Sequence, residues 1–570
     1  MSHTQAPVNI PLNALTTREL LENTKRRYPM RPSFSFVDEE PMLYEDFYNS
    51  VVTVSNLLTE SGIGFGDRVA ILSENGPHWA VAYFAITGMG AIAVPILPDF
   101  HAHAVQHILL HSEAKAIFIS EKHMVKLDEL EAPPTPMLIN IESFQRIEAG
   151  LTRDRLREIK DVGMREFRRL SALARRAANI IPQTPAEDDV ASIIYTSGTT
   201  GFSKGVVLTH RNLVYNALLV QNLFTITCDD RFLSLIPMSH AYECTLGMLL
   251  PVLHGAQVFY LGKPPTPRVL LPAMEKVRPT VIPAVPLIIE KIFKSSIKPK
   301  LTGNSLMRRL YAIPATRRLL HKMAGKKLQT TLGGCMRAFA FGGAPLAPDV
   351  DLFLYESGFP YATGYGMTEN SPLIAGAGRG EVRPQSCGRV LPGLKVRIDS
   401  PDPQNVVGEI LVKGPTVMRE YYKAPELTEQ TLDEDGWLHT GDLGTMDRQG
   451  FIYIKGRSKN MLLGPSGENI YPEEIEAQML QNPFVLECMV FMQHNRLTAK
   501  VHLDQVKFET EHSGVNEARQ AEIKQELLEK IRKETNELLP DFSKLYKMVE
   551  QPAPFEKTPT QKIKRYLYTS

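Results

Sequence analysis

The first half of the chain alternates short apolar runs with longer stretches in which apolar residues recur at helical spacing. Residues 67–76 are typical of a strand followed by a turn, 77–88 of a helix, and 91–97 of a second strand. A helix over 102–112 then precedes another strand at 114–120. This β–α–β order predicts a largely parallel sheet covered by helices, and such sheets bind ligands beyond their strand ends.

One apolar stretch, Trp79 to Pro98, contains twenty residues without a charge and has the length of a membrane span. The segment Gly88-Met89-Gly90 divides it into a helix and a short strand. We therefore expect a buried helix–turn–strand unit, with a membrane span as the less favoured alternative. Residues 1–16 lack a basic segment followed by an apolar one, so we expect no secretory signal peptide.

The pattern changes after Gly393 to short β-like runs separated by turns. A smaller α+β region follows Lys459, and it includes a helix in which Ile523, Leu527 and Ile531 recur every four residues along one face.

At 570 residues the chain is too long for one core, so several domains or subdomains are expected. The polar stretch 456–459 lies between two apolar strand signals, and we place a boundary there. Residues 1–456 would form an N-terminal domain and residues 457–570 a C-terminal domain, with a hinge near Lys459.

Composition limits the classes of partner. The sequence has 43% hydrophobic and 22% charged residues, and its net charge of +1 gives no overall attraction to nucleic acid. Its five cysteines are scattered and odd in number, which argues against a disulfide framework or a zinc site and favours a reducing compartment.

Charge is uneven along the chain. Between Lys291 and Pro348 there are twelve Lys and Arg residues and no Asp or Glu. A solvated helical face is one interpretation of this segment. The other is a basic patch that faces anionic lipid or a phosphate-bearing partner, since each basic residue near such a surface contributes about 1 kcal/mol.

The segment 193–210 carries Ser and Thr hydroxyls, glycines and Lys204 between two apolar runs. The runs predict a buried strand ending at Tyr195 and a second strand at 206–208. Small side chains between them let backbone N–H groups approach an anion, although an ordinary surface turn is the alternative. The segment is not a Walker A loop, because Gly205 stands where that loop has a magnesium-binding hydroxyl residue.

Further motifs accompany this loop. The sequence YTSGTTGFSKGV resembles the phosphate-loop signature of the adenylate-forming enzymes, namely acyl-CoA synthetases, luciferases and peptide-synthetase adenylation domains. Other signatures of that family follow in its order, as PMSHAYE (237–243), FGGAPL (341–346), GYGMTENSP (364–372), GWLHTGDLG (436–444), KGRSKNMLLGPSGENIYPEEIE (455–476) and EKTPTQKIKR (556–565). The resemblance implies an α/β fold, with a large N-terminal domain of layered α/β subdomains plus a distorted β-barrel. A small mobile α+β domain would follow it.

The chemistry of adenylation suits several of these residues. Attack of a carboxylate on the α-phosphate of ATP brings two anions together, so catalysis should come from positioning and positive charge. Lys204 suits the leaving pyrophosphate, Glu369 suits Mg²⁺, and Thr368 can donate to the α-phosphate. The loop residues expected to contact phosphate are Thr196, Ser197, Gly198, Thr199, Thr200 and Gly201.

The resemblance implies roles for the nucleoside. Tyr365, followed by Gly366, would stack on adenine, Asp442 would accept hydrogen bonds from the ribose hydroxyls, and Arg457 would support that contact. Without the family pattern, Tyr365 would be core, and Asp442 and Glu369 would be caps or turn residues. The opposite wall of the adenine pocket would consist of Gly342, Gly343 and Ala344.

The resemblance also implies roles for the C-terminal domain. Lys562 would bridge the substrate carboxylate and the α-phosphate during adenylation; otherwise it belongs to a solvated basic tail. Lys459 occupies the position of the hinge about which this domain rotates between half-reactions. Gly467 falls in the loop that would border the thiol tunnel after rotation.

The motif at 237–243 bears on the substrate. Amino-acid-activating relatives pair an early aspartate with the substrate ammonium, and this chain has Ala241 instead. A buried, unpaired ammonium is costly, which argues against an α-amino acid. His240 would lie beside the carboxylate and the acyl-tunnel entrance, or else be structural. Residues 285–292 and the basic insertion after them resemble the long-chain fatty acyl-CoA synthetase branch.

The predicted protein is an ATP-dependent fatty acid–CoA ligase for medium to long chains, which forms acyl-AMP and releases pyrophosphate and AMP. Its co-substrates and cofactor would be ATP, CoA and Mg²⁺. Acyl carrier protein is the alternative acceptor, another carboxylic acid the alternative substrate, and a non-catalytic lipid-binding or transport protein the remote alternative. We expect a cytoplasmic monomer or homodimer without a nucleic-acid partner. Segment 291–348 could attach it to the inner face of the membrane.

Overall fold

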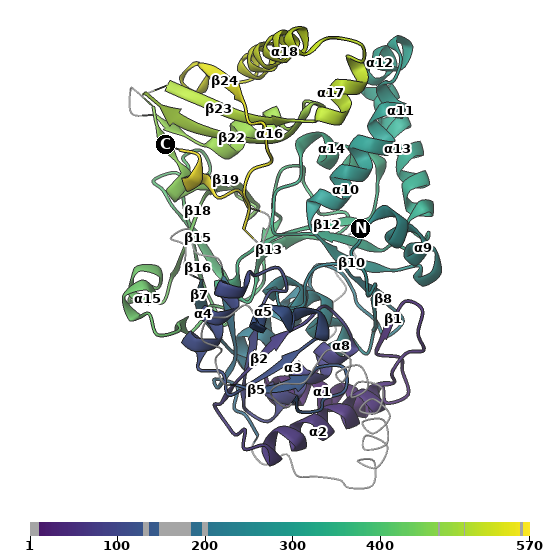
Figure 1. Ribbon diagram of the computed structural model, residues 1–570, viewed down its shortest axis with the longest axis vertical. Coiled ribbons are helices and arrows are strands. Elements are labelled where there is room, and N and C mark those ends of the chain that lie inside the picture. Colours follow the sequence, from purple (N-terminus) through teal and green to yellow (C-terminus); the bar gives the residue numbers. More distant parts are fainter. Residues whose placement is uncertain are drawn as a thin grey trace.

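The computed structural model describes residues 11–128, 136–147, 184–196, 203–464, 468–494, 496–558 and 562–569. Figure 1 shows the N-terminal helices α1 (Thr17–Arg27), α2 (Tyr44–Glu60) and α3 (Pro77–Gly88) at the bottom of the molecule. The C-terminal strands and helices lie at the top. Two large sheets and a four-stranded sheet occupy the space between these ends.

The first large sheet has seven strands and contains the predicted β–α–β units. Strands β2, β3, β4 and β5 run parallel, whereas β6 and β7 form an antiparallel pair at the other side of β3. In spatial order the strands are β17 (Glu420–Tyr421), β7 (Lys204–Thr209), β6 (Val190–Thr196), β3 (Ile92–Pro95), β2 (Arg68–Leu72), β4 (Ala116–Ile119) and β5 (Met137–Asn140).

The uncharged stretch at 79–98 is confirmed as a helix, a turn and a strand. Helix α3 is buried all round, which explains why it shows no polar face in the sequence. Gly90 adopts a φ of +79° in the turn that leads to β3, a conformation that favours glycine. None of the helices in the described ranges has the length and apolar character that a membrane crossing needs.

The second large sheet has eight strands, parallel from β1 to β12 and antiparallel from β12 to β14. Its strands, in spatial order, are β1 (Phe34–Phe36), β9 (Gln257–Tyr260), β8 (Arg231–Ser234), β10 (Val281–Ala284), β11 (Ala338–Phe341), β12 (Tyr361–Gly366), β13 (Leu373–Ala377) and β14 (Arg389–Val390). The family motifs at 341–346 and 364–372 therefore begin at the carboxyl ends of two neighbouring parallel strands, where ligand sites are expected.

Other helices among the described residues of the N-terminal part connect these strands. They are α4 (Ala102–Ser112), α5 (Val125–Asp128), α7 (His210–Val220), α8 (Leu250–His254), α9 (Pro267–Val277), α10 (Pro286–Ile292), α11 (Lys298–Thr302), α12 (Ser305–Ala312), α13 (Pro314–Thr331), α14 (Pro348–Ser357) and α15 (Pro425–Thr431). The region after Gly393 forms an antiparallel four-stranded sheet in the order β15 (Lys395–Asp399), β16 (Gly408–Lys413), β18 (Leu438–Met446) and β19 (Ile452–Arg457).

The C-terminal part has a hydrophobic core cluster of its own. Leu528 and Ile531 of α18 (Glu517–Glu537) pack in a cluster with residues of β22 and β23. The elements of this part are β20 (Leu462–Leu463), β21 (Asn469–Ile470), α16 (Pro472–Met479), β22 (Val485–Gln493), β23 (Arg496–Leu503), α17 (Gln505–Glu511), α18 and β24 (Lys547–Glu550). A single 3₁₀ turn, Ser458–Asn460, joins it to β19, so the proposed boundary coincides with the end of a strand.

Candidate functional site

The two ends of the glycine-rich segment lie side by side, because Thr196 at the end of β6 is paired with Lys204 at the start of β7. The two predicted strands are thus confirmed. The Thr196 hydroxyl is buried and has no hydrogen-bond partner among the described residues, so it can serve a phosphate oxygen. The other predicted loop residues, Ser197, Gly198, Thr199, Thr200 and Gly201, lie outside the described ranges.

Lys204 belongs to a charged cluster with Glu369 and Tyr421. Lys204 Nζ lies 3.3 Å from Glu369 Oε1 and donates a hydrogen bond of 2.5 Å to the Tyr421 hydroxyl. That hydroxyl in turn donates to Glu369 Oε1 over 2.7 Å. Glu369 is only 5% exposed, so its negative charge depends on these partners.

Glu369 is the one residue predicted to bind metal. Within the described part of the chain, no three His, Cys, Asp or Glu side chains gather into a site that could hold an ion by themselves. A single carboxylate nevertheless fits Mg²⁺, since that ion often takes one or two protein carboxylates and completes its shell with phosphate oxygens and water. The donor chemistry at Glu369 is therefore compatible with Mg²⁺ that arrives with a nucleotide.

A second carboxylate, Asp442 on β18, is held between a phenol and a guanidinium. The Tyr365 hydroxyl donates to Asp442 Oδ2 over 2.8 Å, and Arg457 Nε lies 2.9 Å from Oδ1. The contact with Arg457 follows from strand pairing, because these two residues face each other across β18 and β19. Each carboxylate oxygen can accept more than one hydrogen bond, so capacity for two ribose hydroxyls remains.

Glycines occupy close-packed positions at the ends of β11 and β12. A side chain at Gly366 would come within 2.1 Å of the backbone oxygen of Pro372, and one at Gly342 would press on the Tyr242 ring at 3.3 Å. Gly343 has a φ of +81°, and it is exposed together with Ala344. The segment predicted to line the adenine pocket, residues 342–344, therefore follows β11 directly and has little side-chain volume.

His240 is neutral in this site. Its Nδ1 accepts a hydrogen bond from the backbone N–H of Tyr242 at 3.2 Å, so the proton of the neutral imidazole lies on Nε2. Burial, reinforced by the positive charge of Lys562, lowers the pKa of His240 to about 4. A neutral Nε2–H can donate to a carboxylate or carbonyl oxygen.

Lys562 is brought to this site from the other end of the chain. Lys562 is exposed to solvent, yet it interacts electrostatically with Glu369, Asp442, Arg457 and His240. Desolvation lowers the pKa of Lys562 and Arg457 adds to that effect, while the carboxylates of Asp442 and Glu369 oppose it. The structure thus brings the predicted C-terminal lysine together with the nucleotide-site residues.

The segment that carries Lys562 is anchored to the C-terminal sheet. Arg565 donates to the buried Glu476 at 2.5 Å, and Lys557 lies 2.5 Å from Glu487. Phe555 packs against residues of β22 in a small apolar cluster. A short antiparallel bridge joins Lys557 to Ile563. These contacts fix the position of Lys562 relative to β22.

The other predicted residues are less tightly placed. Thr368 is half-buried next to Glu369, and Lys459 is exposed in the turn after β19. Gly467 lies outside the described residues. The structure does not bring Lys459 into the charged cluster, which is consistent with the connecting role expected of it.

Tyr421 and Arg565 are site or anchor residues that the sequence did not single out. Tyr421 has no motif around it, and only the antiparallel pairing of β17 with β7 places it beside Lys204. Arg565 ends the last recognised motif, but its partner Glu476 is distant in sequence. In both cases only the contacts in the folded structure identify the residue as part of the site.

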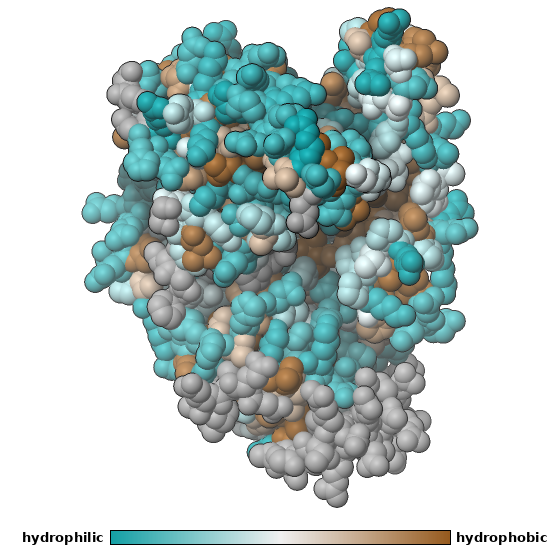
Figure 2. Space-filling view, turned by 45° about the horizontal axis from the view of Figure 1, so that its top comes forward, coloured by the Kyte–Doolittle hydropathy of each residue, from teal (hydrophilic) through white to brown (hydrophobic). Residues whose placement is uncertain are grey.

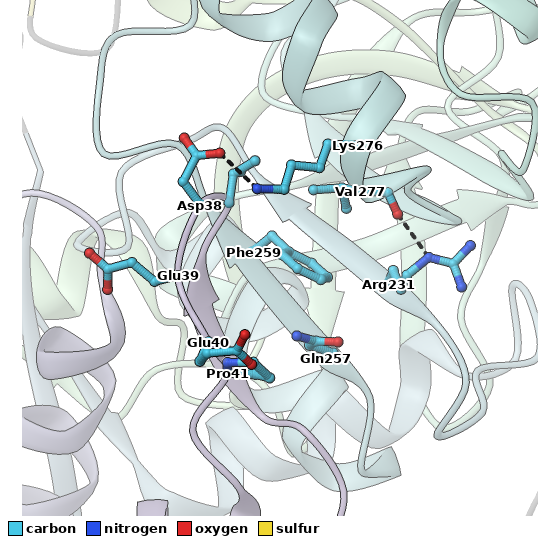
Figure 3. A pocket seen from close by; sticks show the side chains of 10 residues that line it. Asp38, Glu39, Glu40, Pro41, Arg231, Gln257, Phe259, Lys276 and Val277 are labelled. Carbon is cyan, nitrogen blue, oxygen red and sulfur yellow. Dashed lines mark hydrogen bonds and ion pairs between the residues drawn. The ribbon is translucent and has the colours of Figure 1, made fainter.

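A separate surface pocket of about 380 Å³ lies near the edge of the eight-stranded sheet (Figure 3). Three of its charged side chains are already engaged, because Asp38 pairs with Lys276 at 2.9 Å and Arg231 donates to the Val277 carbonyl at 2.9 Å. None of the predicted site residues lines this pocket. It is not part of the charged cluster.

The sequence is similar to one family over most of its length. The profile of the family described as AMP-binding enzyme matches residues 21–422. Long chain acyl-CoA synthetase 6, a peroxisomal protein of Arabidopsis thaliana, is 32% identical over 483 residues, which cover 80% of this chain and 67% of that protein. A long-chain-fatty-acid–CoA ligase of Bacillus subtilis (strain 168) is 27% identical over 512 residues, covering 85% and 84%.

Solved structures share the fold. ATP-bound MatB from Rhodopseudomonas palustris matches with a TM-score of 0.73 at 23% identity, over 97% of this chain and 98% of that chain. The anthranilate CoA ligase AuaEII in complex with anthranoyl-AMP matches with a TM-score of 0.75 at 20% identity, over 98% and 97%. At these identities the likeness establishes the common fold.

Proposed function

The chain belongs to the AMP-binding enzyme family, and on that premise we propose that it is an ATP-dependent fatty acid–CoA ligase acting through an acyl-AMP intermediate. The observation that carries the proposal is the convergence of Lys204, Glu369, Asp442, His240 and Lys562 on one site. These residues are scattered over most of the sequence, and together they supply the charges that a nucleotide and a carboxylate require.

In the first half-reaction a carboxylate oxygen of the acid bonds to the α-phosphorus of ATP, and the bond from that phosphorus to the oxygen bridging the α- and β-phosphates breaks. Lys204 neutralises the departing pyrophosphate, and Lys562 holds the carboxylate against the α-phosphate. Asp442 accepts from the ribose hydroxyls while Tyr365 stacks on adenine. Mg²⁺, which Glu369 would hold, supplies neutralising charge on the phosphates when bound.

In the second half-reaction a thiolate attacks the acyl carbon of acyl-AMP, and AMP leaves with the electrons of the acyl–oxygen bond. Lys562 blocks that approach as long as it stays in the nucleotide site. Residues 457–570 therefore rotate as a domain about Lys459, which withdraws Lys562 and brings the segment around Gly467 to the thiol. The single turn Ser458–Asn460 between β19 and the C-terminal part supports this hinge.

The acid is a fatty acid of medium to long chain, as the names of the curated relatives support. Ala241 offers no charge to a substrate ammonium, and the uncharged His240 suits an acid with an apolar tail. The thiol acceptor is CoA, with acyl carrier protein as the alternative that experiment must separate.

The test of this proposal is product formation with purified full-length protein, ATP, Mg²⁺, CoA and acids from C6 to C18, beside amino and aryl acids. Acid-dependent release of AMP with a thioester of a medium- or long-chain fatty acid is the expected result. Thioester formation only on a phosphopantetheinylated acyl carrier protein would replace CoA as acceptor. Turnover of ATP that is independent of any acid would contradict the proposal.

Peripheral contact with an anionic membrane is the second part of the proposal, and it rests on the surface of α12 and α13. No residue of α12 is buried. Four apolar side chains of this surface are between 52% and 65% exposed, namely Leu306, Ile313, Leu319 and Met323. In Figure 2 the lobe at the upper right carries hydrophobic and hydrophilic residues side by side. This mixture is typical of helices that lie in a membrane interface.

Some basic residues of segment 291–348 already form ion pairs within the protein. Arg317 and Arg318 lie 2.8 and 3.6 Å from Glu356, so these two residues, which the sequence counted in the patch, are poorly suited to bind lipid. Lys298 pairs with Asp349 in the same way. The exposed basic residues of α12 and α13 that have no acidic partner among the described residues are Arg308, Arg309, Lys322, Lys326 and Lys327.

Binding to vesicles tests this contact. Replacement of Arg308, Arg309, Lys322 and Lys326 by Gln removes about 4 kcal/mol of attraction, and affinity for anionic vesicles should fall up to about a thousandfold. The matched control replaces Lys263, Lys395, Lys530 and Lys533 by Gln and should bind as the wild type does. Equal binding by both variants would refute the contact. Leu319→Ser with Met323→Ser should weaken binding at high salt as well.

A further inference from the structure

Two histidines of α4 contact the residues that flank the glycine-rich segment. His111 Nδ1 lies 2.7 Å from the Tyr195 hydroxyl, and Tyr195 immediately precedes Thr196 in β6. His107 Nε2 lies 3.3 Å from the backbone oxygen of Ser203, the residue before Lys204. One helix therefore holds the chain both before and after residues 197–202.

The two imidazoles form one unit, because their rings stack at a centroid distance of 5.4 Å with an angle of 20°. A carbonyl oxygen only accepts hydrogen bonds, so His107 must carry its proton on Nε2 and donate it to Ser203. Tyr195 is 2% exposed, and its hydroxyl finds its polar partner in His111. Loss of this partner would leave a buried hydroxyl unpaired, which costs free energy.

The same unit reaches the strand that carries Tyr421. The Tyr422 ring lies edge-on to His111 at 5.6 Å, and Lys423 donates to the His111 backbone oxygen over 3.0 Å and pairs with Glu113 at 2.6 Å. Neighbouring residues of a strand point to opposite faces, so Tyr421 serves the charged cluster while Tyr422 packs on the histidines. Helix α4 thereby contacts β6 and the chain directly after β17, the two strands that lie on either side of β7 and Lys204.

We propose that His107 and His111 are positioning residues for phosphate binding, which hold the two ends of the glycine-rich segment at the spacing that ATP requires. This inference rests on the proposed function of that segment as the binding site of the β- and γ-phosphates. The histidines act through Tyr195 and Ser203 and touch no reacting atom. Their effect should thus be confined to steps that use those phosphates, which excludes thioester formation from acyl-AMP.

The experiment compares His107→Leu with His111→Leu, which remove the polar atoms, and His107→Gln with His111→Asn, which keep a polar group near the lost nitrogen. The matched control is His103→Leu, an exposed histidine one turn earlier on α4. MgATP binding is measured by calorimetry, the Michaelis constants for MgATP and fatty acid by turnover, and the second half-reaction from supplied acyl-AMP.

The leucine variants should bind MgATP about tenfold more weakly and raise its Michaelis constant by the same factor. The constant for fatty acid and the rate from supplied acyl-AMP should stay within twofold of the wild type. The Gln and Asn variants should recover most of the affinity, and His103→Leu should be unchanged.

Unchanged MgATP binding in the leucine variants would overturn the inference. So would an equal loss in both half-reactions, because that pattern indicates a general effect on folding. A third outcome separates the two proposals. If the wild type binds MgATP more tightly than the leucine variants do, but forms no acyl-AMP from any acid, the proposed function is overturned and the positioning role stands.

Discussion

The ammonium group of Lys204 lies 3.3 Å from the carboxylate of Glu369, although these residues are 165 positions apart in the sequence. Tyr421 joins them, since its hydroxyl accepts from the lysine and donates to the glutamate. The lysine also lies 4.1 Å from the centre of the Tyr421 ring. The pair is thus oriented before any nucleotide arrives, which reduces the reorganisation that adenylation requires.

Tyr421→Phe removes the hydroxyl and keeps the ring. Glu369 then loses a charge-assisted hydrogen bond, and we expect the Mg²⁺ concentration for half-maximal adenylation to rise about tenfold. Titration of Mg²⁺ at saturating ATP measures this effect. Tyr422→Phe, one residue later and outside the charged cluster, is the control. Equal Mg²⁺ requirements in Tyr421→Phe and the wild type would show that the hydroxyl does not orient Glu369.

Asp442→Asn replaces a charged acceptor with a neutral amide and leaves Arg457 without its partner. Hydrogen bonds to charged groups contribute about 1.5–3 kcal/mol, so the Michaelis constant for MgATP should rise about 10- to 100-fold. Tyr365→Phe retains the ring and loses only the bond to Asp442, and its effect should stay below about fivefold. A larger effect of Tyr365→Phe than of Asp442→Asn would contradict the role of Asp442 toward ribose.

Lys562→Ala should abolish the formation of acyl-AMP while largely sparing thioester formation from supplied acyl-AMP. The reason is that the ammonium is required between two anions only in the first half-reaction. Separate assays of the two half-reactions measure the difference. Lys564→Ala, which removes a neighbouring lysine paired with Glu556 at 3.4 Å, is the control. Equal losses in both half-reactions would mean that Lys562 has another role.

Glu243 gives the stability of the protein a dependence on pH. It is fully buried, and burial raises the pKa of its carboxyl to about 8 against a smaller opposing effect of Ser234. The native state therefore keeps a proton that the unfolded chain releases near its ordinary pKa of 4.5. This contribution to stability is complete below that value and is lost as the pH rises toward 8.

We therefore expect the melting temperature of the wild type, relative to that of Glu243→Gln, to fall between pH 5 and pH 8. Calorimetry of both proteins at several pH values measures the difference, and Glu60→Gln, an exposed change at the end of α2, controls for general charge effects. A constant difference over this range would show that Glu243 is not protonated in the native state.

Much of the framework could be predicted because it depends on local pattern. The glycines at 88–90 correctly divided the apolar stretch after Trp79, and the runs around Tyr195 and Val207 correctly predicted the two strands on either side of the glycine-rich segment. In the structure, the motifs at 341–346 and 364–372 begin at the carboxyl ends of β11 and β12, and the motif at 436–444 overlaps β18.

The rest depends on contacts between residues that are distant in sequence. Arg317 looked free for a partner because the segment around it has no acid, but α14 supplies Glu356. Tyr421 carries no motif, and His107 and His111 look like ordinary residues of an amphipathic helix. Only the packing of α4 and β17 against β6 and β7 reveals what these side chains contact.

The central claim is that the site joins a fatty acid to AMP with release of pyrophosphate, and isotope exchange measures that step alone. Labelled pyrophosphate should enter ATP in the absence of CoA, only when a fatty acid is present, with a maximum among medium- or long-chain acids. The same exchange should be absent from Lys562→Ala. Exchange that does not require any acid, or that persists without Lys562, would contradict the account.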